Sequence, residues 1–115
     1  MTRRRIPPLL AAACLLAAIL ASCAAPSADR RKEADARMRM GVTYLDQRNL
    51  PMAMRELTKA SELDPENAEV EMVLGLAYQA RGDLSKAEEH LRRSIDMKPE
   101  YADARNNLGT VLAER

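Results

Sequence analysis

Phenylalanine and tryptophan are absent from this 115-residue sequence, and tyrosine occurs only three times. A hydrophobic core must therefore be built from aliphatic side chains and from the seven methionines. The chain is 47% hydrophobic and 30% charged, and aliphatic, alanine-rich and charge-rich chains usually form helices. Its length leaves room for one small domain.

Metal-binding and nucleophilic side chains are also scarce. His90 is the only histidine, and both cysteines, Cys14 and Cys23, lie near the N-terminus. The segment EEHLRR around His90 is charged, so we expect a solvated surface histidine. Three of the glycines lie inside helical patterns and not in a glycine-rich turn after a strand, which argues against a phosphate-binding loop. We therefore predict that the protein is not an enzyme and has no cofactor, no metal site and no small-molecule substrate.

A strong net charge of one sign is missing as well. The net charge is +1, and the arginines at positions 3–5 supply three of the positive charges. Without residues 1–22, 15 basic residues face 17 acidic ones, a net charge of −2. Domains that bind nucleic acid carry a dense basic face, so we expect no nucleic-acid partner.

The first 22 residues have the layout of a signal peptide. A basic segment at residues 3–5 precedes an uncharged apolar run over residues 9–21. That run is shorter than the roughly 20 residues a membrane-spanning helix needs. A basic start followed by a short apolar run is typical of a secretory signal peptide.

The stretch Leu20-Ala21-Ser22-Cys23 resembles the lipobox of bacterial lipoproteins. The resemblance implies cleavage before Cys23, a diacylglyceryl group on its thiol and an acylated amino group; the alternative is a signal peptide that merely contains a cysteine. Two or three acyl chains hold a protein on a membrane, whereas one binds marginally. Cys14 would be removed, which leaves no thiol for redox chemistry or a disulfide.

The residues after the cysteine are small, polar or charged. We expect residues 23–33 to form the lipidated cysteine and a flexible tether. Ala24 rather than aspartate follows the cysteine. By resemblance to enteric-type lipoproteins, this favours the periplasmic face of the outer membrane.

A 34-residue period runs through the rest of the chain. Gly41, Gly75 and Gly109 recur at this spacing. Further equivalent positions are Pro65 and Pro99; Tyr44, Tyr78 and Leu112; Ala53 and Ala87; Leu57 and Leu91; Ala60 and Ser94. The pattern resembles the tetratricopeptide repeat, a helix–turn–helix unit of 34 residues. The resemblance implies an all-α, right-handed superhelix of about two and a half repeats over residues 34–67, 68–101 and 102–115.

The sequence departs from the tetratricopeptide pattern at one position of each repeat. Arg37, Glu71 and Arg105 replace an aromatic residue near the start of each first helix.

Apolar spacing predicts helices over about 34–47 and 52–63, with Pro65 in the first turn of the next helix. The following helices should end near Gly82-Asp83 and Lys98-Pro99, and a fifth should begin near Ala104. The predicted apolar face of the first helix contains Ala36, Met40, Val42, Tyr44 and Leu45.

A glycine inside a helix costs roughly 1 kcal/mol against alanine. We therefore expect a close helix crossing at each repeated glycine, with Ala53 and Ala87 as the residues that meet Gly41 and Gly75. About three repeats are usually needed for stability. We expect that the sequence is a fragment or that the array needs a partner.

In the tetratricopeptide family the first helix of each repeat lines a concave surface. The corresponding side chains here are Met38, Val42, Leu45, Met72, Leu76, Gln79, Asn106 and Thr110, together with Asn107. Some members clamp a peptide C-terminus with cations here, but methionines occupy the cation positions, so we expect no carboxylate clamp. Flexible methionines suit an adaptable apolar groove, and ordinary packing, or cover by the chain's own tether, explains the same residues equally well.

These features together predict an outer-membrane-anchored, periplasm-facing adaptor or scaffold that binds an envelope protein or peptide. It resembles the pilotin-like lipoproteins of type IV pilus biogenesis, which pair a lipobox with early tandem repeats. The alternative is the non-catalytic repeat domain of a larger envelope enzyme or cytochrome-maturation complex.

Overall fold

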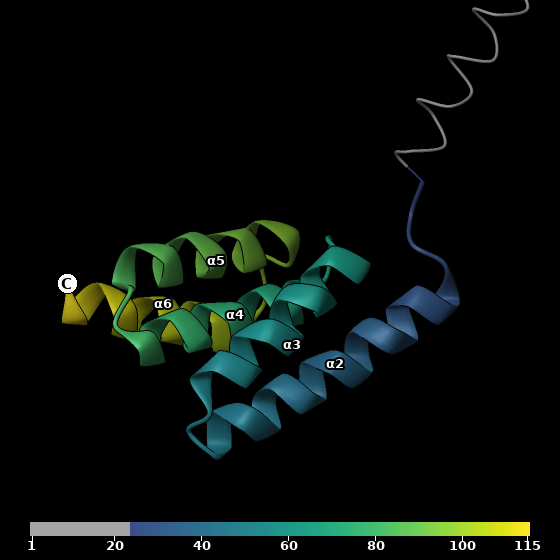
Figure 1. Ribbon diagram of the computed structural model, residues 1–115. Helices are drawn as coiled ribbons and strands as arrows, with labels where there is room; N and C mark the ends of the chain where they lie inside the picture. The colour runs from purple at the N-terminus through teal and green to yellow at the C-terminus, as the bar shows by residue number, and fades with distance from the viewer. Residues whose placement is uncertain (1–23) are drawn as a thin grey trace, which may run out of the picture.

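The computed structural model describes residues 24–115, which form five α-helices. They are α2 (Ala28–Asp46), α3 (Leu50–Leu63), α4 (Ala68–Arg81), α5 (Leu84–Met97) and α6 (Ala102–Glu114) (Figure 1). The prediction of an all-α chain is confirmed for this part of the sequence. None of these helices is long and apolar enough to cross a membrane.

The helices form two complete hairpins and the first helix of a third. α2 packs along α3 and α4 along α5, and these are the most extensive helix contacts in the described region. α3 then contacts α4, and α5 contacts α6, so each hairpin stacks on the next. The first helices, α2, α4 and α6, also touch one another in turn. This stacking produces the predicted two and a half repeats.

Short polar residues fix where the second helices and α4 begin. The side-chain oxygens of Asn49, Asn67 and Asp83 accept hydrogen bonds from backbone N–H groups in the first turns of α3, α4 and α5. Such caps satisfy donors that the helix itself leaves without partners. The predicted role of Pro65 was wrong. Pro65 lies in the turn before Asn67, and α4 starts only after that cap.

α2 begins at Ala28, earlier than the predicted start near residue 34. Ser27 caps it by accepting a hydrogen bond from the N–H of Arg30 at 3.3 Å. The guanidinium of Arg30 also donates to the backbone oxygen of Glu62 at 3.2 Å, which attaches the start of α2 to the end of α3. The predicted flexible tether is therefore helical from residue 28 onward.

The buried face of α2 also differs from the predicted one. Ala34, Met38 and Gly41 are buried, whereas Ala36 is exposed and Met40 is 46% exposed. The buried residues follow a four-then-three spacing, which keeps them on one side of a helix. Met40 lies off that line, so its hydrophobicity did not indicate burial.

The repeated glycines let the two helices of each hairpin approach closely. A Cβ atom added at Gly41 would lie 2.5 Å from Cγ of Leu57, and one at Gly75 would lie 2.7 Å from Cγ of Leu91. The close crossings are confirmed at Gly41 and Gly75. Leucine side chains meet both glycines, and of the two predicted alanines only Ala87 also meets its glycine, through a backbone oxygen 3.3 Å from the added Cβ. Gly109 differs, because a Cβ there would have nothing within 4 Å.

We predict opposite effects for Gly75→Ala and Gly109→Ala. The new methyl group at Gly75 would collide with Leu91 and approach the backbone oxygen of Ala87 at 3.3 Å. Overpacking typically costs about 1–3 kcal/mol, which exceeds the gain in helix propensity. Gly109→Ala has open space and should gain up to about 1 kcal/mol. Urea denaturation of both variants measures this, and a Gly75→Ala protein as stable as the parent would contradict the close crossing.

Candidate protein-binding site

The concave candidate surface lies along the first helices, α2, α4 and α6. Met38 and Met72, which the 34-residue period relates, are only 7% and 9% exposed and belong to one hydrophobic cluster. Their side chains therefore pack between neighbouring helices. Of the predicted groove, the accessible residues are Val42, Leu45, Leu76, Gln79, Asn106 and Thr110. Binding of a partner by these residues stays a prediction.

Val42 is the most accessible apolar side chain of this surface, at 37% exposed. Leu76, the equivalent residue of the next repeat, is half-buried. Toward α6 the surface becomes polar. Gln79 donates a hydrogen bond to Glu114 at 2.7 Å, and the Thr110 hydroxyl donates to the backbone oxygen of Asn106 at 3.2 Å. The surface thus changes from apolar on α2 to amide and hydroxyl groups on α6.

A hollow of about 500 Å³ lies at one end of this surface. It is lined by Leu45 and Asp46 of α2, Arg48 and Leu50 of the following turn and helix, and Ala80 of α4. The hollow combines an apolar floor with one cation and one anion.

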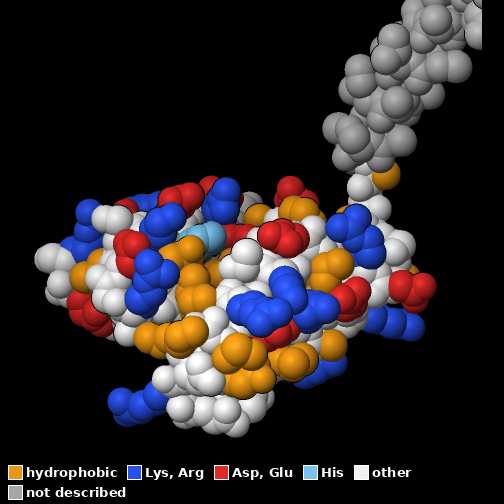
Figure 2. All heavy atoms as spheres, in the orientation of Figure 1, with side chains coloured by type: hydrophobic (Ala, Val, Ile, Leu, Met, Phe, Trp, Pro, Cys, Tyr) orange, Lys and Arg blue, Asp and Glu red, His pale blue; other side chains and the backbone are white. Residues whose placement is uncertain are grey.

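Charges of both signs are mixed on the molecular surface. On the face shown in Figure 2, Lys and Arg side chains are interspersed with Asp and Glu side chains, and apolar side chains lie between them. Long-range attraction on that face is therefore weak, and recognition there must depend on local contacts.

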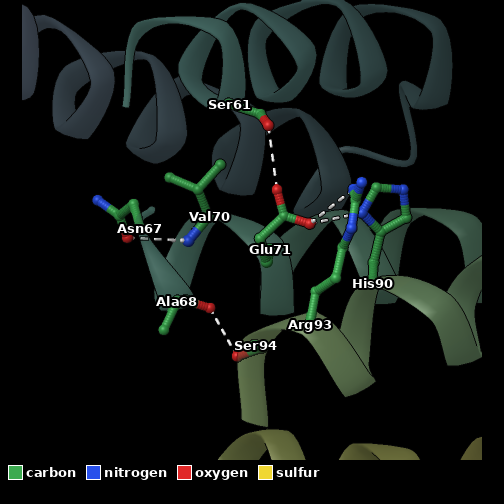
Figure 3. Close-up of polar contacts among 8 residues, drawn as sticks. All are labelled: Ser61, Asn67, Ala68, Val70, Glu71, His90, Arg93 and Ser94. Carbon is green, nitrogen blue, oxygen red and sulfur yellow. Dashed lines mark hydrogen bonds and ion pairs between the residues drawn. The ribbon is translucent and has the colours of Figure 1, made fainter. Parts of the chain in front are cut away.

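A buried polar cluster centres on Glu71, whose side chain is 3% exposed (Figure 3). The hydroxyl of Ser61 donates to one carboxylate oxygen at 3.0 Å. Nδ1 of His90 lies 2.7 Å from the other oxygen, and the guanidinium of Arg93 lies 3.7 Å from it. The cluster thus connects α3, α4 and α5 through a single carboxylate.

The prediction of a solvated His90 was wrong. Its side chain is 14% exposed, and its ring stacks on Tyr78 at 5.0 Å between centroids and 9° between planes. The Nδ1 atom must carry the hydrogen in the contact with Glu71, because an ionised carboxylate has none to donate. The charged neighbours of His90 in the sequence concealed its burial.

Burial of Glu71 opposes ionisation, but its partners outweigh that effect. Desolvation raises the pKa of the Glu71 carboxyl, whereas hydrogen bonds from His90 and Ser61 and the positive charges of His90 and Arg93 lower it. The net result is a pKa below the ordinary glutamate value. Glu71 is therefore an ionised structural anchor at neutral pH.

The first repeat contains the same contact with its charges exchanged. Arg37 occupies the position of Glu71, and its guanidinium donates to Glu56 at 3.0 Å. Glu56 in turn occupies the position of His90, since both pairs are related by the 34-residue period. In the sequence, the only sign of these ion pairs was that Arg37 and Glu71 replace the family's aromatic residue. The structure identifies their partners, Glu56 and His90.

Cys23 and the signal peptide over residues 1–22 lie outside the described residues. Among residues 24–115, no group of three or more His, Cys, Asp or Glu side chains is arranged to hold a metal ion.

Comparison with known sequences identifies the repeat. A sequence model described as the tetratricopeptide repeat matches residues 38–99 and, in an overlapping second match, residues 72–115. No curated protein matches this chain.

Two solved structures illustrate the likeness. The second such domain of Spaghetti (RPAP3), bound to the HSP90 peptide SRMEEVD, is 19% identical with a TM-score of 0.70, over 75% of this chain and 80% of that one. At that identity it shows the fold alone. Pseudomonas aeruginosa pilF is 30% identical with a TM-score of 0.71, over 75% of this chain, which spans 39% of pilF.

We predict that Glu71→Gln lowers the free energy of unfolding at neutral pH by about 1.5–3 kcal/mol, the range for hydrogen bonds to a charged group. The folded pKa lies below the ordinary value of 4.5, so this stabilisation is complete above that value. It is lost as the pH falls through the folded pKa. The difference from the parent should therefore shrink on acidification.

Urea denaturation at neutral pH and at acidic pH measures the effect. Glu89→Gln, at an exposed position of α5, is the control and should stay within about 0.5 kcal/mol of the parent. A difference between Glu71→Gln and the parent that does not change with pH would contradict an ionised Glu71.

Proposed function

This chain belongs to the tetratricopeptide repeat family, and we propose that it is a lipid-anchored adaptor that binds an envelope protein. One observation supports the proposal most strongly. Cys23, in a lipobox-like segment, is followed within a few residues by α2, the first helix of a fold that binds proteins in this family. A repeat of this family presents a surface and supplies no chemistry of its own. An anchor would fix that surface at one membrane.

The concave surface determines which partners fit. Met38 and Met72 occupy the positions where a carboxylate clamp needs cations, and both are buried. A partner is therefore recognised by apolar side chains against Val42 and Leu76. The amide and hydroxyl groups of Asn106 and Thr110 add hydrogen bonds at the other end.

The early start of α2 determines how close the domain lies to the membrane. Only residues 24–27 separate Cys23 from the first helical residue, Ala28. An extended chain spans at most about 3.3–3.6 Å per residue. A lipid on Cys23 would hold the domain within roughly 15–20 Å of the membrane surface, counting the five peptide steps from Cys23 to Ala28. Ala24 supports the outer membrane as that surface.

Type IV pilus biogenesis is the process we propose for this adaptor. The likeness to pilF, at 30% identity over 75% of this chain, supports it. The lipobox-like segment that ends at Cys23, joined to tandem repeats, also resembles the pilotin-like lipoproteins of that process.

The anchor is tested by replacing Cys23. We predict that the mature protein starts at Cys23, carries acyl chains and is recovered with outer membranes. Cys23→Ser should block lipidation, because serine lacks the thiol, and should leave an unprocessed or soluble protein. Intact-mass analysis and membrane fractionation measure both effects. An unmodified N-terminus at any other residue would refute the anchor.

The concave surface is tested by two substitutions. Val42→Glu places a charge at an exposed position, so the domain should stay folded and lose its partner. Met72→Glu buries an unpaired carboxylate and should unfold the domain at neutral pH. Circular dichroism measures folding.

Partner contact is then measured in cells of the source bacterium with a photo-crosslinking residue at position 42. The same residue at Glu89, on α5, is the control. One discrete envelope protein crosslinked only from position 42 supports the adaptor. Identical products from both positions, or none from position 42, would count against the concave surface.

A further inference from the structure

Arg48, in the turn between α2 and α3, has an unusual backbone conformation. Its φ is 58°, and among the described residues it is the only one other than glycine with a positive φ. In this left-handed region the Cβ atom of a side chain crowds the following carbonyl oxygen, a cost that glycine does not have. Residues held in such conformations occur preferentially at functional sites.

The equivalent turn of the second hairpin shows that the fold does not need this arginine. Gly82 lies 34 residues after Arg48 and has a φ of 87°. Each of the two residues donates its N–H at 2.9 Å to the carbonyl oxygen three residues earlier, and the residue after it donates to the oxygen five residues earlier. The two turns therefore have the same hydrogen bonds, and the second uses the residue that avoids the strain.

The side chain of Arg48 makes no contact within the molecule that would offset this strain. Arg37 and Arg92 each bind a glutamate. Arg48 is exposed, and no hydrogen bond, ion pair or aromatic contact of the described residues involves its guanidinium. Its five N–H donors are therefore available to a ligand.

The hollow of about 500 Å³ beside this turn supplies apolar surface next to the guanidinium. Leu45, Leu50 and Ala80 form its apolar part, and Asp46 lies with Arg48 on its rim. Ala80 belongs to α4, so the two complete hairpins form the hollow together. From Ala28 to Asp46 the helix rises by about 27 Å, at 1.5 Å per residue. That distance from the anchored end of α2 favours a protein ligand over the headgroups of the anchoring membrane.

We propose that Arg48 binds one carboxylate of the envelope protein, and that an apolar side chain beside this carboxylate fills the hollow. A guanidinium binds a carboxylate through two parallel hydrogen bonds. Asp46 on the same rim repels further negative charge, so a single acidic residue fits better than an acidic run. The contact is not a carboxylate clamp, because Arg48 lies in a turn and not on a first helix. It rests on the proposed adaptor function and specifies the chemistry of the partner.

Substitutions at position 48 separate the strain from the charge. Arg48→Gly removes both, Arg48→Asn removes the charge at a position that asparagine tolerates, and Arg48→Lys keeps the charge. We expect Arg48→Gly to lower the equilibrium constant of unfolding by about threefold, because relief of the strain outweighs the greater freedom of glycine in the unfolded chain. Urea denaturation of the purified full chain measures this. An Arg48→Gly protein less stable than the parent would overturn the proposal, since the arginine would then stabilise the fold.

Binding is measured in cells of the source bacterium with a photo-crosslinking residue at position 47, which is exposed between the two rim residues. We expect one crosslinked envelope protein whose yield falls about tenfold with Arg48→Gly and with Arg48→Asn. Arg48→Lys should reduce the yield by less than about threefold, because the positive charge remains. Arg55→Asn, at an exposed position of α3, is the control and should leave the yield unchanged.

Mass spectrometry of the crosslinked peptide identifies the partner's segment, which should contain an acidic residue beside an apolar one. Exchange of that acidic residue for arginine should abolish the product, and Arg48→Glu in the same cells should restore it. No product from position 47, a product only with a second copy of this chain, or equal yields from the parent and Arg48→Gly would each overturn the proposal. A product from position 47 without one from position 42 would count against the concave surface and support the contact at Arg48.

Discussion

The spacing of the helices in the two complete hairpins depends on the contact between a glycine in the first helix and a leucine in the second. Gly41 receives Leu57 and Gly75 receives Leu91, at distances that leave no room for a methyl group. A chain without phenylalanine or tryptophan has few bulky side chains with which to fill a wider gap. Close approach of the backbones replaces that missing volume, so the core of this array is thin and consists mainly of alanine, leucine and valine.

Polar contacts then hold this thin core in register. The carboxylate of Glu71 is bound by residues from the helix before it and the helix after it, so it joins one hairpin to the next. The Ser94 hydroxyl adds a second tie by donating to the backbone oxygen of Ala68 at 2.6 Å. Because no buried side-chain nitrogen or oxygen in the described region lacks a hydrogen-bond partner, these groups stabilise the fold without the penalty of unsatisfied burial.

The 34-residue period and the turn residues were sufficient to predict the fold over residues 34–115. In a repeat, the residues that a helix pair needs recur at equivalent positions, so each helix is indicated more than once. Single-position features were harder to predict. The start of α2 lies in a charged segment without apolar spacing, so only the Ser27 cap marks it. The burial of His90 depends on Glu71 and Tyr78 of another helix, which local sequence cannot show. For the candidate groove, the period placed Met38 and Met72 on equivalent positions, but their burial depends on how closely neighbouring hairpins stack.

The exchanged charges of the first two hairpins affect which second helix pairs with which first helix during folding. Correct pairing brings Arg37 to Glu56 and Glu71 to His90. If α4 paired with α3 instead of α5, the carboxylates of Glu71 and Glu56 would meet in a buried site, and like charges there are costly. Repeat arrays are prone to misassembly between similar units. Opposite charges in the two complete hairpins therefore distinguish α2 from α4, which the equivalent apolar residues Met38 and Met72 do not.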